Sequence, residues 1–218
     1  MTGSPEGPDL STLRREYGDA GLAEEAAGGD PWALWQRWFA DVVASGMHEP
    51  NAMVVATSSA DGAPSARMVL LKGYDAAGFR FFTNTTSRKG EELAAEPRCA
   101  LLFPWHPLER QVRVEGAAER LTEAEVAAYF ASRPRGAQLG AWASPQSQVV
   151  ADRATLAAAY DEADRRFGDG EVPVPPGWGG YRVRPDAFEF WQGRPGRMHD
   201  RLRYSRTATT WDRVRLAP

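Results

Sequence analysis

Residues 51–84 have the sequence NAMVVATSSADGAPSARMVLLKGYDAAGFRFFTN, and this stretch decides the fold class. Apolar runs at 51–59, 65–74 and 78–84 are separated by turn signals such as Asp61-Gly62, which is typical of hairpins. This pattern predicts a meander of antiparallel strands. Further strand-like runs follow along the chain, about six to eight in total, with helices between them. We therefore expect an α+β protein that is mainly β: an antiparallel barrel with flanking helices.

Three helices can be placed from their caps and spacing. Asp30 can cap a helix with Pro31 at its first position, and Gly46 can end it. A capping box, Thr122 to Glu125, opens a second helix, and residues 152–168 predict a third. The apolar residues of the first helix have helical spacing and should pack on the core: Trp32, Trp35, Trp38, Phe39, Val42 and Val43.

The composition is that of a globular protein, with 43% hydrophobic and 25% charged residues among 218. A net charge of -3 argues against a general nucleic-acid binder, so any anion site must be local. The single cysteine, Cys99, excludes an internal disulfide, and its strand-like surroundings indicate a structural thiol rather than a nucleophile. His48, His106 and His199 lack metal-ligand spacing, so we expect no metal site.

The chain divides into an arm and a domain. Residues 1–28, which begin with glycine, proline and serine, predict a flexible N-terminal arm, and residues 29–218 predict a single domain. No apolar run reaches the roughly 20 residues that span a bilayer, and the start does not resemble a signal peptide. We therefore expect a cytoplasmic protein that does not contact membranes.

The segment 189–206, EFWQGRPGRMHDRLRYSR, is rich in arginine. If it forms one strand, its alternate residues share a face that would bind an anion and carry a titratable imidazole. The alternative is an exposed edge strand that its charges keep soluble. The charged face would consist of Arg197, His199, Arg201 and Arg203, and the more apolar face of Met198, Leu202 and Tyr204.

Other cations lie beside local features that suit an anion. Ser87 can cap a helix, and Arg88 and Lys89 follow at its N-terminus, where free backbone N–H groups favour a phosphate. Two solvated side chains are the alternative. Arg67 and Lys72 flank an apolar run, and a regular strand would send them to opposite faces because their separation is odd.

Three further patterns leave a choice between a ligand and simple packing. Tyr129 and Arg133 share a helix face, which suits a ligand or surface packing. The polar face of residues 111–115 meets solvent or a ligand, and residues 14–17 are a frayed helix start or an arm that folds over a ligand. Because one phosphate needs about two or three cations, the separated cation groups suit two phosphate-bearing ligands.

The residue blocks together resemble the pyridoxine/pyridoxamine 5'-phosphate oxidase family. The resemblance runs from about residue 14 to residue 218 and rests on blocks that recur in order: EPNAMVVAT, ARMVLLK, FFTNTTSRKG, LLFPWHPLERQVRVEG, YFASRPR, GAWASPQS, WGGYRV, EFWQGRPGRMHDR and RLAP. It implies an FMN-binding split barrel whose C-terminal region dimerises, working as a homodimer with FMN at the subunit interface.

The activity implied by the resemblance is oxidation of pyridoxamine and pyridoxine 5'-phosphates to pyridoxal 5'-phosphate. A hydride passes to the flavin, and dioxygen accepts the electrons and yields hydrogen peroxide. The implied FMN-binding residues are Arg67, Met68, Val69, Leu70, Leu71, Lys72, Phe82, Thr83, Arg88, Lys89, Gln111, Gln146, Ser147, Trp191 and Arg201. The implied substrate-binding residues are Arg14, Arg15, Glu16, Tyr17, Lys72, Tyr129, Arg133, Ala137, Arg197, Met198 and His199, with Arg197 and His199 as the catalytic pair.

Two positions depart from the family pattern. Phe82 stands where a tyrosine is common, and Ala137, which cannot donate a hydrogen bond, stands where a serine usually assists the substrate phosphate. Two rival functions are a phenazine-biosynthesis-type flavin oxidase and a non-catalytic flavin- or vitamin-phosphate-binding module. The first would lack the phosphate grip of Lys72, Tyr129 and Arg133, and the second would lose Arg197 and His199.

Overall fold

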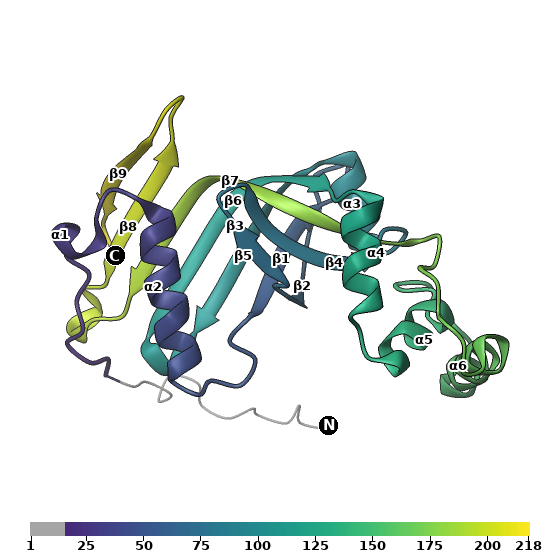
Figure 1. Cartoon of the computed structure of the whole chain (residues 1–218). Helices are drawn as coiled ribbons and strands as arrows, with labels where there is room; N and C mark the ends of the chain where they lie inside the picture. Colours follow the sequence, from purple (N-terminus) through teal and green to yellow (C-terminus); the bar gives the residue numbers. More distant parts are fainter. Residues whose placement is uncertain (1–15) are drawn as a thin grey trace, which may run out of the picture.

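The computed structural model describes residues 16–218, which form a curled antiparallel sheet with helices around it (Figure 1). The predicted meander is present, but its second run is split, because β2 ends at Leu70 and a short β3 begins at Gly73. The strands are β1 (Ala52–Ser58), β2 (Pro64–Leu70), β3 (Gly73–Asp75), β4 (Gly78–Asn84), β5 (Arg98–Trp105), β6 (Arg110–Arg120), β7 (Trp178–Gln192), β8 (Asp200–Arg206) and β9 (Trp211–Leu216).

The sheet branches at β7. Its main order is β2-β1-β5-β6-β7-β4-β3, and β8 and β9 extend from β7 off this path. The first part of β7, residues 178–183, pairs with β4, whereas residues 187–192 pair with β8. The register between β6 and β7 shifts at Glu115/Gly116, where Asp186 of β7 has no partner on β6. Such a bulge bends its strand and increases the twist, and it lies where β7 changes partner. The long strand β7 thus belongs to two branches of the sheet, one with β4 and one with β8, and the branches diverge (Figure 1).

Helix α2 (Pro31–Ala44) covers the inner face of the sheet beside β8 (Figure 1). Asp30 caps it as predicted, accepting a hydrogen bond from the amide of Trp32, and Gly46 follows its end. Trp35 is fully buried and packs against Phe79 and Phe103, with ring centroids at 4.8 and 4.5 Å. The prediction for this helix holds except at Val43, which is exposed.

A group of helices lies at the end of the molecule opposite α2 (Figure 1). It consists of α4 (Glu123–Ala131), which has the predicted capping box, α5 (Arg135–Ala143), which was not predicted, and α6 (Arg153–Phe167). Their small core contains Phe130, Leu139, Ala163 and Val172. The other helices are α1 (Glu24–Ala27) and α3 (Arg88–Ala95), with short 3-10 turns η2 (His106–Leu108) and η3 (Pro195–Arg197).

The predicted fold class, mainly β with an antiparallel barrel-like sheet and flanking helices, is confirmed. Cys99 is buried, as expected for a structural thiol, and burial raises the pKa of its thiol to about 12. Within residues 16–218 no helix has the length and apolar character needed to cross a membrane.

Candidate functional site

A cavity of about 800 Å³ opens among β2, β4, α4 and α5, within the size range of small-molecule sites. Most of its wall was predicted as ligand-binding, but Ser132 and Trp178, which also line it, were not. The predicted residues in the wall are Arg67, Met68, Val69, Leu70, Lys72, Phe82, Thr83, Lys89, Tyr129, Arg133, Ala137 and Gln146.

Arg67 and Lys72 both line this cavity, although a regular strand would separate them. The strand is not regular that far, because β2 ends at Leu70 and Leu71 is buried in the core. The amide of Lys72 then donates to the carbonyl of Arg80 in β4 at 2.8 Å. The chain therefore turns toward β4 before Lys72, and the odd spacing does not set the direction of its side chain.

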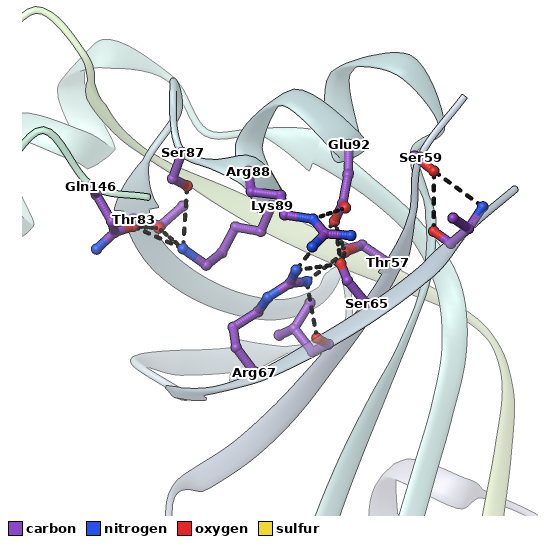
Figure 2. A network of polar contacts seen from close by, with 12 residues as sticks. Thr57, Ser59, Ser65, Arg67, Thr83, Ser87, Arg88, Lys89, Glu92 and Gln146 are labelled. Carbon is purple, nitrogen blue, oxygen red and sulfur yellow. Dashed lines mark hydrogen bonds and ion pairs between the residues drawn. The ribbon is translucent and has the colours of Figure 1, made fainter. Parts of the chain in front are cut away.

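Arg67 belongs to a polar cluster with Arg88, Glu92, Thr57 and Ser65 (Figure 2). Glu92 Oε2 accepts hydrogen bonds from Thr57 Oγ1 at 2.5 Å, Ser65 Oγ at 2.6 Å and Arg67 Nη2 at 3.2 Å. Glu92 Oε1 accepts from Arg88 Nε at 2.8 Å. Burial alone would raise the pKa of Glu92, but the hydrogen bonds from Ser65, Thr57 and the two arginines lower it to about 2.

Lys89 lies beside this cluster and is only 7% exposed. Its Nζ donates to Thr83 Oγ1 at 3.0 Å, Ser87 Oγ at 3.2 Å and Gln146 Oε1 at 2.8 Å (Figure 2). Among residues 16–218 no carboxylate is bonded directly to it, and burial together with the nearby charge of Arg67 lowers the pKa of Lys89 to about 8. The ammonium is thus a poorly compensated buried cation, which an anion in the cavity would stabilise.

Helix α3 begins after Ser87, as predicted, but the hydroxyl does not cap it. Instead Ser87 Oγ donates to the carbonyl of Asn84 at 2.6 Å and accepts from Lys89. Gly90 in the first turn lies so close to Thr85 that an added Cβ would overlap its carbonyl. The helix start is therefore pressed against the end of β4, which brings Lys89 to the cavity.

An aromatic cluster forms a different part of the wall. The rings of Phe82 and Tyr129 stack with centroids 3.9 Å apart, and Phe82 stacks on Trp178 at 5.5 Å. The guanidinium carbon of Arg133 lies 5.0 Å above the Trp178 ring, a favourable cation–π geometry. Lys72 adjoins this cluster, because it lines a smaller cavity of about 270 Å³ with Phe82 and Tyr129.

The guanidinium group of Arg133 has a buried donor that suits an anion. Its Nη1 is buried and has no hydrogen-bond partner within residues 16–218, and burial lowers the pKa of its guanidinium. Buried donors are nearly always paired in folded proteins. A phosphate in the cavity would supply the missing acceptor.

The other predicted site residues form a second group, away from the wall of the main cavity. Gln111, Trp191 and Arg201 are cross-strand neighbours on β6, β7 and β8, so their side chains share one face of the sheet. Tyr17 packs edge-on against Trp191 at 5.8 Å and His199 at 5.5 Å. Tyr17, Gln111 and Trp191 line a separate cavity of about 380 Å³.

The predicted continuous strand through Arg197 and Arg203 was wrong. Residues 195–197 form the turn η3, in which Gly196 and Arg197 both have φ of 61°, and β8 starts only at Asp200. The turn reverses the chain between β7 and β8, so Arg197 and His199 do not belong to the face of Arg201. Met198 was placed on the apolar face but is 69% exposed, whereas Leu202 and Tyr204 are buried as expected.

Arg201 and Arg203 do share a strand face, but both are paired with carboxylates. Arg201 Nη2 lies 2.8 Å from Glu189 Oε1, and Arg203 Nη2 lies 3.2 Å from Glu115 Oε2. Arg113 Nη2 also contacts Glu189, at 2.5 Å. The polar face of β6 therefore meets the charges of β7 and β8 within the same chain.

The orientation of His199 fixes its neutral tautomer. The backbone amide of Arg194 donates to His199 Nδ1 at 3.1 Å. Because a backbone amide can only donate, Nδ1 carries the lone pair and Nε2 carries the proton of the neutral ring.

The remaining predicted residues are distributed as follows. Arg88 contributes through Glu92 and does not line the main cavity, and Ser147 lies in an exposed loop with φ of 71°. Glu16 is exposed. Arg14 and Arg15 lie outside the described residues.

Sequence reasoning missed Glu92 and Trp178. Glu92 follows Arg88 by four residues on a helix, which is the spacing of an ion pair, so a signal was present. Trp178 belongs to no chemical motif, and only the fold brings it to Phe82 and Arg133. Within residues 16–218 no group of three or more metal-ligating side chains comes together.

The chain matches known sequences over nearly its whole length. Residues 39–166 match the family described as "Pyridoxamine 5'-phosphate oxidase", and residues 178–218 match the "Pyridoxine 5'-phosphate oxidase C-terminal dimerisation region". A protein of Nocardioides sp. named pyridoxine/pyridoxamine 5'-phosphate oxidase is 60% identical, covering 96% of this chain and 98% of that protein. A protein of the same name from Rubrobacter xylanophilus is 58% identical, covering 98% and 100%.

Two solved structures share the fold. PhzG from Burkholderia lata, crystallised with tetrahydrophenazine-1-carboxylic acid, has a TM-score of 0.85 at 31% identity and covers 92% of this chain and 100% of that chain. A pyridoxamine 5'-phosphate oxidase-related, FMN-binding protein from Nostoc punctiforme has a TM-score of 0.70 at 16% identity and covers 88% of this chain and 100% of that chain. The fold expected from the sequence resemblance, a split barrel, is thereby confirmed.

Proposed function

The chain belongs to the pyridoxamine 5'-phosphate oxidase family, and we propose that it oxidises pyridoxamine 5'-phosphate and pyridoxine 5'-phosphate to pyridoxal 5'-phosphate. We further propose FMN as the cofactor and dioxygen as the electron acceptor, which is reduced to hydrogen peroxide. Oxidation of pyridoxamine 5'-phosphate also consumes a water molecule and releases ammonia when the imine is hydrolysed. A flavin cofactor agrees with the family and with the FMN-binding structural relative.

One observation carries this proposal: the main cavity contains two separate sets of cations. Arg67 and Lys89 belong to the polar side, and Lys72 and Arg133 to the aromatic side. Two sets suit two phosphates, one on the cofactor and one on the substrate. An enzyme that oxidises a phosphorylated vitamin with FMN needs both.

The polar cluster fits the FMN phosphate. Lys89 is a buried cation that has no directly bonded carboxylate in the described part of the chain, and Arg67 and Arg88 approach from β2 and α3. Gln146 and Thr83 accept hydrogen bonds from Lys89, so a phosphate there would compete with or add to these neutral acceptors. When bound, the flavin supplies the two-electron acceptor, which no side chain of this protein can provide.

The aromatic cluster fits the substrate phosphate. Arg133 presents an unpaired donor, Lys72 adds a charge, and Tyr129 is fixed by its stack on Phe82. Phe82 makes this contact through its ring face, so the tyrosine common at position 82 is not needed for it. Ala137 lines the cavity but provides no donor. We expect Lys72, Tyr129 and Arg133 to carry the phosphate contacts without it.

Residues from another copy of the chain would complete the site: Tyr17, Trp191, Arg197, Met198 and His199. Within one chain, none of these residues lines the main cavity. The match of residues 178–218 to a dimerisation region supports a homodimer. We propose that FMN lies at the subunit interface, with Gln111, Trp191 and Arg201 on one side of it.

Within this arrangement Arg197 would hold the substrate ring and align the reacting C–H bond. Alignment dominates such steps, since a displacement of about 1 Å can cost about a hundredfold in rate. His199 would place its Nε2–H toward a polar substituent of the substrate, because Nδ1 is occupied by the amide of Arg194. Tyr17 would cover the site through its contacts with Trp191 and His199.

The test is an assay of purified protein loaded with FMN, given pyridoxamine or pyridoxine 5'-phosphate in air. We expect pyridoxal 5'-phosphate and hydrogen peroxide in equal amounts. A protein that binds FMN but forms neither product from these substrates would contradict the proposal. Turnover of a phenazine precursor instead would favour the activity of the PhzG-like relatives.

A further inference from the structure

Glu92 is a carboxylate buried at the back of the polar cluster, where no ligand contact has been assigned to it. It is 5% exposed and lies on α3, one turn after Arg88. Figure 2 shows its carboxylate in contact with the guanidinium groups of both Arg67 and Arg88. The carboxylate therefore connects two cations that come from different elements of the fold.

The contacts of Glu92 explain how a charge is tolerated at this depth. An isolated buried carboxylate would be neutralised by a raised pKa. Here two hydroxyls and two guanidinium groups donate to it, and the pKa of Glu92 falls to about 2. The side chain is thus an anion at neutral pH.

This anion fixes the orientation of both arginines. The two Nη groups of Arg67 donate hydrogen bonds to Glu92, Ser65, Thr57 and the carbonyl of Val55. Arg88 gives Nε to Glu92, and within residues 16–218 its Nη groups have no hydrogen-bond partner. The guanidinium plane of Arg67 is therefore held before any ligand arrives, and Arg88 is tethered through Nε, so less side-chain entropy is lost on binding.

The charge balance of the cluster also matches a phosphate. Arg67, Arg88 and Lys89 contribute three positive charges and Glu92 one negative charge, which leaves about +2. A phosphate monoester carries about −1.5 to −2 at neutral pH. Without Glu92, the three cations would lack this negative charge, and burial together with the charge of Arg67 already lowers the pKa of Lys89.

Resting on the proposed FMN function, we propose that Glu92 is a positioning residue of the flavin phosphate site, acting through Arg67 and Arg88. Glu92 does not touch the flavin in this proposal. It sets how strongly the protein distinguishes FMN from riboflavin, which lacks the phosphate.

The test compares the binding of FMN and riboflavin to flavin-free protein, followed by flavin fluorescence. In Glu92→Gln we expect the Kd for FMN to rise about tenfold or more, the effect of one lost charge-assisted hydrogen bond, and the Kd for riboflavin to stay unchanged. Equal losses for both flavins, or no loss for either, would overturn the proposal.

Two further variants separate positioning from folding. Glu91→Gln removes an exposed carboxylate from the neighbouring position of the same helix and should change neither Kd. Glu92→Asp keeps the charge but draws it back by one methylene, so its selective loss of FMN affinity should be smaller than that of Glu92→Gln. If Glu92→Gln does not fold, Glu92→Asp decides: FMN binding unaltered in that variant would refute the positioning role.

These results are distinct from a failure of the proposed function. If the wild-type protein binds FMN no better than riboflavin, the phosphate site itself is wrong, and FMN is not the cofactor. If the wild-type protein prefers FMN and Glu92→Gln retains that preference, only the role of Glu92 is wrong.

Discussion

The polar and aromatic clusters of the cavity hold their cations by different means. In the polar cluster, Arg67 and Arg88 are hydrogen-bonded to a buried carboxylate. In the aromatic cluster, Arg133 rests on the ring of Trp178 and leaves Nη1 without a partner in the described part of the chain. Hydrogen bonds fix the orientation of a guanidinium group, whereas a cation–π contact fixes mainly its distance from the ring.

The difference suits ligands with different residence times. A preformed cluster loses little entropy when its ligand binds, which favours a cofactor that stays. A cation held loosely on a ring can adjust to a substrate and then release a product. The polar cluster would therefore determine cofactor affinity, and the aromatic cluster would determine the KM for the substrate.

The largest effect should come from neither cluster but from Arg197, which would complete the site from the second copy. We expect Arg197→Ala to lower kcat about a hundredfold or more, because the substrate ring is no longer aligned. FMN content, measured by absorbance, should stay at the wild-type level. Normal turnover with full FMN occupancy would remove Arg197 from the catalytic pair.

The next largest effect should be at Lys72, beside the aromatic cluster. Loss of one charge-assisted hydrogen bond is worth about 1.5–3 kcal/mol, so Lys72→Met should raise the KM for phosphorylated substrates about tenfold to a hundredfold. Unphosphorylated pyridoxamine serves as the control, since its weak turnover should not change. A KM equal to that of the wild type would show that the phosphate lies elsewhere.

A smaller effect should follow from removal of the ring beneath Arg133. Trp178→Ala should raise the KM for substrate about twofold to thirtyfold, in line with a cation–π contact of about 0.5–2 kcal/mol, while Trp178→Phe should recover most of the loss. The matched control is Trp142→Ala. The guanidinium carbon of Arg166 lies 4.9 Å from the ring centroid of Trp142, which is also a cation–π contact, and Trp142 packs on the same small helical core as Trp178. Trp142 lines neither the main cavity nor the smaller cavity beside Lys72.

If Trp142→Ala raises the KM as much as Trp178→Ala, the effect is one of stability and the distinction between the clusters fails. If Trp178→Ala instead weakens FMN binding, the aromatic cluster serves the cofactor. Both measurements use the same purified proteins, with FMN titrated by fluorescence.

The smallest effect is a pH dependence of FMN binding. The pKa of Lys89 in the flavin-free protein is about 8, lowered by burial and by Arg67, and a bound phosphate would raise it. Above about pH 7 the FMN phosphate is almost wholly a dianion, since its second pKa is about 6. Binding takes up a proton above pH 8, so FMN affinity should be constant between about pH 7 and pH 8 and fall as the pH rises further. Lys89→Met should bind FMN more weakly and show no such fall, whereas an unchanged affinity in the wild type up to about pH 9.5 would contradict the assignment.

Much of the fold could be predicted because its signals are local. The cap of Asp30, the capping box at Thr122 and the strand periodicity of residues 51–84 each depend on a few neighbouring residues. The irregular places could not be predicted in this way. The turn at Arg197 lies where the chain leaves β7 and reverses to pair with it as β8. The bend before Lys72 lies where the chain leaves β2 and meets β4.

The site was predictable in its cations but not in what surrounds them. Arginines and lysines are visible in a sequence, and the family resemblance assigned most of them to ligands. The surroundings of Glu92 are not visible, because Thr57 and Ser65 lie 35 and 27 residues away along the chain. Whether a carboxylate is a solvated surface group or a buried anchor is decided by such distant contacts.

The separation of the main cavity from the group of Tyr17, Trp191 and His199 also has a genetic meaning. If each working site takes one part from each copy, a chain with a damaged cavity and a chain with a damaged Arg197 can pair so that one site carries both defects and the other carries none. With random pairing about a quarter of all sites would be intact. The two sets of residues would then behave as two complementation groups within a single gene.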